Sequence, residues 1–472
     1  MYLPYQIAQK FEYLNNTKTT IKNAIKSYGI SVSDSLPFRN YAEKIQKIKE
    51  KDVNFYDYDG SLLYSYSKDE FLALSEMPAN PTHSGLTSQG WNYSLQNAQS
   101  YVTNYKYLDI GQNYTTTDGS SKYYINTSNY SNIELNFEIK LNGEVIIDWG
   151  DNTTPVTLTG NDITSVINAT HTYINGGEYI IKITPNTILT MMSLIADAFN
   201  NSGDRSNSYF INKIEVGNHV SDISGSSNST STKMNSIKSI TLPNSITSIT
   251  NIINANVLKC LILPDGLLGF PIIKECYNLT TICMGNGLTS CDTSDNSLWN
   301  LKSLTLPTSV NTFSIGNTNQ VAKALKRIVI PTSVTNGNLL LSYSPIEYFY
   351  GKGGTYRINL NYARALKELI FDDNEDITLL GTSGNPLQGT LSLEKIKFPK
   401  SVTTYNFSYL GYNLKELDMT NYDEVPTTSS TFINQLQTQA KQCKILVPAS
   451  LYNAFINSSY WSSVANRIVS VS

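Results

Sequence analysis

The stretch Leu301-Lys302-Ser303-Leu304-Thr305-Leu306-Pro307-Thr308-Ser309-Val310 carries the pattern that decides the fold of this chain. Three apolar residues at positions i, i+3 and i+5 precede a proline, and a short turn then returns one more apolar residue. Alternate side chains of a strand enter one core, and proline ends the strand because it has no N–H for the ladder. The stretch therefore predicts one strand and one turn of a repeating unit.

The same phrase recurs through the second half of the sequence, and Pro243 and Pro264 lie 21 residues apart. Clear copies begin at Ile237, Leu258, Leu279, Leu301 and Leu325, and looser copies are centred on Phe349, Leu369, Ile396, Leu417 and Ile445. A unit of this length cannot bury its apolar face alone, so successive units stack. We therefore predict a solenoid.

These units resemble the BspA-like leucine-rich repeats of bacterial surface proteins and phage virion proteins, over roughly residues 205–450. The resemblance implies a mainly β, multidomain protein whose residues 191–472 form an irregular leucine-rich-repeat solenoid. Residues 449–472, from Ala449 to the C-terminus, resemble the segment that closes such arrays, so we expect a capping helix there.

A partner is expected on the strand face, where the residues between the buried apolar ones point outward. This face begins with neutral residues such as Thr241, Ile262 and Cys283 and becomes aromatic and charged from Arg327 onward. Tyrosine faces suit sugars or protein loops, although a tyrosine ladder that merely packs is the alternative. The candidate partner-binding residues are Arg327, Tyr348, Tyr350, Glu368, Lys395, Lys397 and Glu416.

Residues 1–50 are predicted to form two short helices that attach or oligomerise the chain. Ile21, Ile25 and Tyr28 share one face of the first helix, and Pro37 opens a second helix that carries Tyr41 and Ile45. The phrases Ile25–Ile30 and Ser35–Phe38 are similar to N-termini of phage structural proteins, which implies binding to other virion proteins. A cap packed on the next domain is the alternative.

Two β units are expected between this segment and the repeats. Residues 51–125 contain a strand entering a turn at Phe55–Gly60 and form a small β-containing module. Residues 126–190 alternate as strands, and Trp149-Gly150-Asp151-Asn152 with His171-Thr172-Tyr173 resembles the PKD-type immunoglobulin-like sandwich. That resemblance implies a structural motif with a core tryptophan, in a domain that serves as a spacer.

Composition and motifs argue against several classes of function. The net charge is −3 without a run of Lys or Arg, which argues against nucleic acid. No apolar stretch is long enough to insert into a membrane. The five Cys lack metal-ligand spacing and are expected to be free buried thiols, and the three His lack catalytic partners in a recognisable motif. We expect no enzyme, no cofactor and no metal, and leave calcium at the Asp-rich turns open.

The first six residues show no basic segment followed by an apolar core, so we expect no secretory signal. The sequence therefore favours a virion protein, a phage fibre or appendage assembled in the host cytoplasm, with a homo-oligomer left open. Its solenoid would recognise a host surface protein or glycan. A BspA-like adhesin of the bacterial cell surface is the alternative, followed by a glycan depolymerase.

Overall fold

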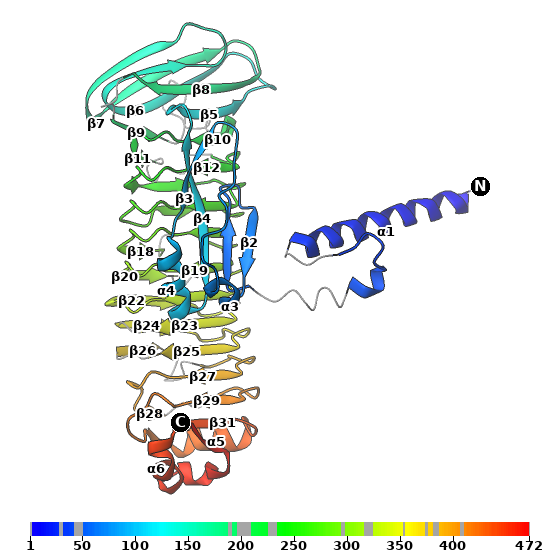
Figure 1. The fold of residues 1–472 in the computed structure, drawn as a ribbon, viewed down its shortest axis with the longest axis vertical. Helices are drawn as coiled ribbons and strands as arrows, with labels where there is room; N and C mark the ends of the chain where they lie inside the picture. The colour runs from blue at the N-terminus through cyan, green and yellow to red at the C-terminus, as the bar shows by residue number, and fades with distance from the viewer. Residues whose placement is uncertain are drawn as a thin grey trace.

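The computed structural model describes residues 2–27, 32–41, 51–186, 191–195, 209–224, 234–293, 298–315, 324–352, 355–372, 376–380, 387–405 and 410–471. The described residues build an elongated stack of short strands, with a strand-rich cap at one end and small helices at the other (Figure 1). None of their helices has the length and apolar character needed to span a membrane.

The predicted solenoid is confirmed, with about nine turns. Strands of one sheet pair in parallel, and Leu304 aligns with Ile328, which aligns with Phe349. Every apolar residue at the centre of a repeat therefore lies over its equivalent in the next repeat. The strands on this side of the solenoid, here called the strand face, belong to three hydrogen-bonded sheets in line with one another. They begin with β12 (Ser239–Thr241), β15 (Cys260–Ile262), β17 (Thr281–Cys283), β19 (Ser303–Thr305) and β21 (Arg327–Ile330). They continue with β23 (Tyr348–Lys352), β25 (Glu368–Asp372), β27 (Lys395–Lys397), β29 (Glu416–Asp418), β31 (Lys444–Pro448) and β32 (Ile468–Val471).

A second set of parallel strands, divided among three hydrogen-bonded sheets, forms the back of the turns. It includes β14 (Asn251–Ile253), β16 (Ile272–Lys274), β18 (Ser290–Asp292), β20 (Thr312–Ile315), β22 (Asn336–Leu340), β24 (Thr355–Asn359), β26 (Asp376–Leu380), β28 (Thr404–Tyr405) and β30 (Thr427–Thr428). The apolar core between the two sheets is one continuous cluster that runs from Tyr123 to Ile468. All five cysteines are buried free thiols, as predicted, and burial raises the pKa of Cys276 to about 12.

Residues 126–190, which are predicted to form a separate sandwich, contain β6 (Ile133–Asp148), β7 (Val156–Tyr173) and β8 (Glu178–Pro185). In the structure these strands share one sheet with β5 (Ser121–Asn126) and β9 (Met191–Ile195), which lie outside the predicted bounds. β5 pairs with β10 (Ile211–Glu215) and β9 pairs with β11 (Val220–Ser224). Because β10 and β11 then pair with β12 and β13 (Ser248–Ile249), the unit is hydrogen-bonded to both sides of the first solenoid turn. It covers the first turn as an N-terminal cap, which differs from the spacer that the PKD resemblance implies.

The tryptophan motif of this cap is structural, as expected. Trp149 is buried and stacks on His171 at 4.8 Å between ring centroids. His171 Nε2 hydrogen-bonds Asp151 at 2.8 Å, and the Tyr173 hydroxyl donates to the carbonyl of Trp149. Asn152 adopts a φ of 66°, a left-handed conformation that asparagine tolerates well.

The C-terminal cap is larger than the predicted segment 449–472. It begins with α5 (Ser430–Thr438) and continues through α6 (Tyr452–Asn457) and a 3-10 turn at Trp461–Arg467. β32 then returns to pair in parallel with β31. The cap therefore buries the last repeat and adds one final strand to the sheet.

The module of residues 51–125 is a small mixed sheet with two helices. Its elements are β1 (Val53–Tyr56), β2 (Leu62–Tyr66), α3 (Lys68–Leu72), β3 (Leu86–Trp91), α4 (Leu95–Tyr105) and β4 (Leu108–Thr116). The sheet order is β2-β1-β4-β3. Figure 1 shows β3 and β4 running along the long axis of the solenoid, across its strands.

In the N-terminal segment the first predicted helix is present and long, because α1 covers Tyr2–Ser27. A 3-10 turn at Phe38–Asn40 follows Pro37, and residues 42–50, over which the predicted second helix would run, lie outside the described residues. Ile25 and Tyr41 are buried in a cluster with Val32, and Ile21 packs against it. Ile25 and Tyr41 therefore pack within this segment, and their role in attachment stays a prediction. Tyr28 and Ile45 lie outside the described residues.

Candidate functional site: the strand face of the solenoid

The strand face is divided into a part covered by the 51–125 module and a part that the module leaves open. Every residue of β4 is buried, because one side of this strand meets the module's own core and the other side meets the solenoid. Leu108 and Ile110 belong to the module's core. Asp109, Gly111 and Asn113 alternate with them and face the solenoid.

The contacts of these three residues show how β4 crosses the repeats. Asp109 accepts a hydrogen bond from Ser303 of β19, and Asn113 Nδ2 donates to Asn244 Oδ1 just after β12. Gly111 lies against Ile262 and Cys283 of β15 and β17. The four residue steps from Asp109 to Asn113 rise about 13 Å along β4. The three distances between neighbouring strands from β19 to β12 add up to about 14 Å. The module strand and the stacked repeats therefore match in length when they cross at a right angle.

The helix α4 extends this contact toward the middle of the solenoid. The Tyr101 hydroxyl donates to the carbonyl of Leu306, and Tyr105 hydrogen-bonds Thr332. The ammonium of Lys352 donates to Asn104 Oδ1 at 3.0 Å. Val329 is buried in the module's core cluster, to which Tyr350 adds its ring. The module thus braces the repeats from β12 to β23.

The expectation that the early outward residues face solvent is wrong. All five of these residues are buried under the module: Thr241, Ile262, Cys283, Thr305 and Val329. Cys260, Ile262 and Cys283 form a small apolar cluster with Tyr56 and Tyr58 of the module. Their small or apolar side chains fit a protein–protein contact, since a covered face gains nothing from charge.

Two of the candidate partner-binding residues already bind the module. Arg327 donates to the carbonyl of Lys51 at 3.3 Å, and its guanidinium lies 4.2 Å from the centroid of the Tyr107 ring. The Tyr350 ring packs edge-on against Tyr107 at 5.5 Å. Burial raises the pKa of the Tyr350 hydroxyl, which donates to Glu368. Arg327 and Tyr350 therefore lie at the boundary between the covered part and the open part of the strand face.

The remaining candidates line the open part of the strand face, from β23 to β29. Tyr348, Glu368, Lys395, Lys397 and Glu416 are all half-buried there, so part of each residue is accessible to solvent. Lys395 and Glu416 form an ion pair of 2.6 Å across neighbouring strands. Burial opposes the charge of Lys395, but Glu416 outweighs burial and raises the pKa of this lysine. Strands with acidic outward side chains therefore alternate with strands that carry basic ones along the open part of the strand face.

Histidine–carboxylate pairs occur away from this face. His83 Nε2 lies 2.7 Å from Asp57 Oδ2, and Asp57 also accepts hydrogen bonds from the Tyr114 hydroxyl and the Tyr58 N–H. The pair holds the loop before β3 against the turn after β1. Within the described ranges, no three His, Cys, Asp or Glu side chains converge on a point where a metal would bind.

Comparisons with known proteins were made for both the sequence and the structure. No family model matches the sequence. No curated protein matches it. Among solved structures, the chain is similar to a leucine-rich cell surface protein of Faecalibacterium prausnitzii, with 16% sequence identity and a TM-score of 0.23. The match covers 59% of this chain and 87% of that protein.

Proposed function

We propose that this chain is a non-enzymatic recognition protein that binds a surface protein or glycan through the open part of its strand face. The observation that carries the proposal is the division of that face. The chain covers its small, neutral residues with its own module and leaves the aromatic and charged rows from Tyr348 to Glu416 accessible. Accessible aromatic and charged side chains on a rigid scaffold suit binding of an external partner.

The finer proposal is that a virion displays the protein as a fibre or appendage, attached to other virion proteins through residues 1–50. It is supported by the resemblance of Ile25–Ile30 and Ser35–Phe38 to N-termini of phage structural proteins. An adhesin of the bacterial cell surface is the alternative location. Antibody labelling in the electron microscope separates the two, because the label would fall on purified particles in the first case and on intact cells in the second.

The recognition surface is tested with the double variant Lys395→Ala/Lys397→Ala. We expect it to weaken binding of the labelled protein to target bacterial cells by about 1–3 kcal/mol, the range for residues at the centre of an interface. Loss of the Lys395–Glu416 ion pair should cost at most about 1 kcal/mol of folding free energy, because the pair is partly exposed. A cell-binding titration and a thermal melt measure the two effects.

Lys441→Ala is the matched control, since Lys441 is an exposed lysine in the C-terminal cap, away from the strand face. It should leave cell binding and melting temperature unchanged. Unaltered binding by the double variant, with normal folding, would place the recognition surface elsewhere.

A further inference from the structure

The sheet of the N-terminal cap ends in an edge strand. Ile139 of β6 aligns with Ile167 of β7 and also with Leu194 of β9, so β7 and β9 lie on opposite sides of β6. Among the strands that the structure describes, β7 pairs with β6 alone. Its other side therefore presents a row of backbone N–H and C=O groups, which is a template for pairing with a further strand.

This edge has an interrupted part and a regular part. Asp162 Oδ1 accepts hydrogen bonds from the N–H groups of Thr164 and Ser165, at 2.7 and 2.8 Å, and the register with β6 breaks at this bulge. From Val166 to the end of β7 the register is unbroken. Ile174 follows, and its carbonyl accepts from the N–H of Asn132, so the regular edge runs from Val166 to Ile174.

The regular edge carries none of the usual protection of an exposed strand. Natural proteins blunt such edges with charged side chains, proline or bulges, and the stretch Val166–Ile174 contains no Asp, Glu, Lys, Arg or Pro. The bulge at Asp162 lies before it. His171 points away from solvent, because its ring stacks on Trp149 and is hydrogen-bonded to Asp151.

The side chains of this stretch alternate in exposure. Ala169 and Tyr173 are buried in the cap. The residues between them and around them face solvent, and these are Val166, Asn168, Thr170, Thr172 and Ile174. Two of them are large and apolar: Val166 is 46% exposed and Ile174 is 68% exposed. They lie on the same face at equal distances from Thr170, since alternate residues of a strand share a face.

We propose that two copies of this chain pair in antiparallel fashion along Val166–Ile174, with a two-fold axis at Thr170. In this register Thr170 meets its own equivalent, and Val166 of each copy lies opposite Ile174 of the other. Both exposed apolar side chains become covered, and no charged residue is brought opposite a like charge.

The symmetry of the pairing favours a second copy over a strand of a different protein. A two-fold contact satisfies the free edges of both copies at once, whereas a foreign strand would itself become a new free edge. The contact lies in the N-terminal cap, away from the open part of the strand face. The dimer would therefore present two recognition surfaces, which raises avidity for a surface that carries many targets.

Disulfide cross-linking of Thr170→Cys tests the register. Directly opposite residues of an antiparallel pair have Cβ atoms about 4.5–5.5 Å apart, close to the separation in a disulfide. All five native cysteines are buried, so the introduced thiol would be the accessible one. Mild oxidation should give a species of twice the 52.5 kDa chain mass on a non-reducing gel. Val156→Cys, at the far end of β7, should remain a single chain.

Sedimentation velocity of the full chain tests the interface itself. Val166→Lys should weaken the dimer roughly ten-fold or more, because the ammonium would be placed against Ile174 of the other copy. Val156→Lys is the matched control, since Val156 lies on the same strand with a similar exposure of 41%. Both variants change exposed side chains, so their thermal melts should match that of the unaltered protein.

Three results would each overturn the proposal. The unaltered chain could sediment as a monomer at high micromolar concentration. The two lysine variants could affect the dimer equally, or Thr170→Cys could fail to cross-link while a dimer persists. The last result would place self-association on another surface of the chain.

Discussion

At the scale of single residues, Gly111 controls how closely the module approaches the solenoid. A Cβ at this position would lie 2.5 Å from Cγ2 of Ile262 and 2.9 Å from the Cβ of Cys283. Real side chains do not tolerate such distances, so β4 touches β15 and β17 only because residue 111 has no side chain. The glycine is needed here for close approach of two strands rather than for an unusual backbone conformation.

We predict that Gly111→Ala loosens the module and costs about 1–3 kcal/mol of folding free energy, the range for overpacking a well-filled contact. Hydrogen exchange should become faster in β4 and in β15, and a chemical denaturation curve measures the stability. Gly269→Ala is the control, because nothing lies within 4 Å of a Cβ built there. Equal stability of the two variants would contradict the close contact.

At the scale of elements, the C-terminal cap seals the open end of the repeat stack. Trp461 is buried, donates from Nε1 to the carbonyl of Pro426 at 3.0 Å, and packs edge-on against Phe432 and Phe455. Arg467 Nη1 donates to the carbonyl of Leu436 in the last turn of α5 and to that of Ala440 just beyond the helix. Because each repeat contacts only its neighbours, the last repeat depends on this cap for the core that no further repeat supplies.

We predict that Trp461→Ala costs about 3–5 kcal/mol, as expected for removal of a large buried aromatic side chain. Unfolding should begin at this end, so hydrogen exchange should accelerate first in β29, β31 and β32. The strands near the N-terminal cap should keep their protection. Tyr412→Ala, at an exposed aromatic residue of the preceding repeats, should change neither protection nor stability, and uniform loss of protection along the solenoid would exclude unfolding from the end.

At the scale of the whole molecule, the described residues of the N-terminal segment have a core separate from those of the module and the solenoid. The described residues of the N-terminal segment form their own cluster around Ile25, Val32 and Tyr41. The cores of the module and of the solenoid contain none of these residues. On α1, Phe11 and Leu14 remain largely exposed, and such side chains suit contact with another protein more than contact with water.

We predict that deletion of residues 1–50 leaves the melting temperature of the remainder unchanged and abolishes association with particles. The physical reason is that none of the described side chains in residues 1–50 belongs to the larger cores. Differential scanning calorimetry measures the first effect, and co-sedimentation of the tagged protein with purified particles measures the second. Truncated protein that still sediments with particles would show that attachment uses another surface.

The repeats were predictable from the sequence because their signal is local. Each strand, its terminating proline and its returning apolar residue lie within about ten residues, and stacking places equivalent positions such as Leu304, Ile328 and Phe349 in register. The change from neutral to charged outward residues at Arg327 was also visible in the sequence. The cause of this change was not visible in the sequence, because a small neutral side chain fits a covered face and an uncovered polar face equally well.

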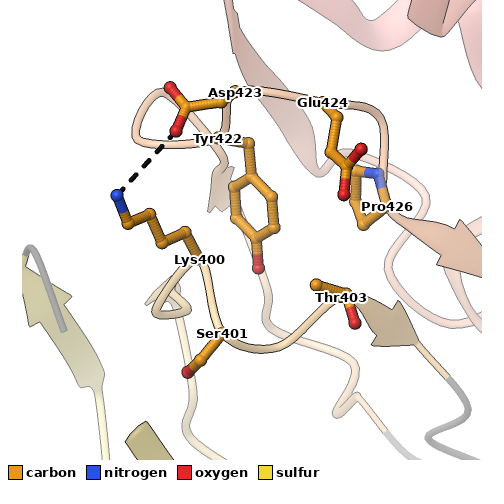
Figure 2. A pocket seen from close by; sticks show the side chains of 7 residues that line it. All are labelled: Lys400, Ser401, Thr403, Tyr422, Asp423, Glu424 and Pro426. Carbon is orange, nitrogen blue, oxygen red and sulfur yellow. Dashed lines mark ion pairs between the residues drawn. The ribbon is translucent and has the colours of Figure 1, made fainter. Parts of the chain in front are cut away.

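Only the tertiary structure decided which half of the strand face is open. The contacts that cover it join Asp109 to Ser303, Asn113 to Asn244 and Tyr105 to Thr332, pairs more than 130 residues apart in the chain. No local pattern encodes such pairs, since they arise from the match between the length of one strand and the spacing of several repeats. The contacts between neighbouring turns likewise depend on stacking, as the hydrogen bond from the Tyr422 hydroxyl of one repeat to the Pro399 carbonyl of the preceding repeat shows. Figure 2 shows the Tyr422 ring reaching from its own turn toward the turn that carries Ser401 and Thr403. The sequence by itself therefore determined the repeating scaffold, and the packing of distant segments determined which of its surfaces are free to bind.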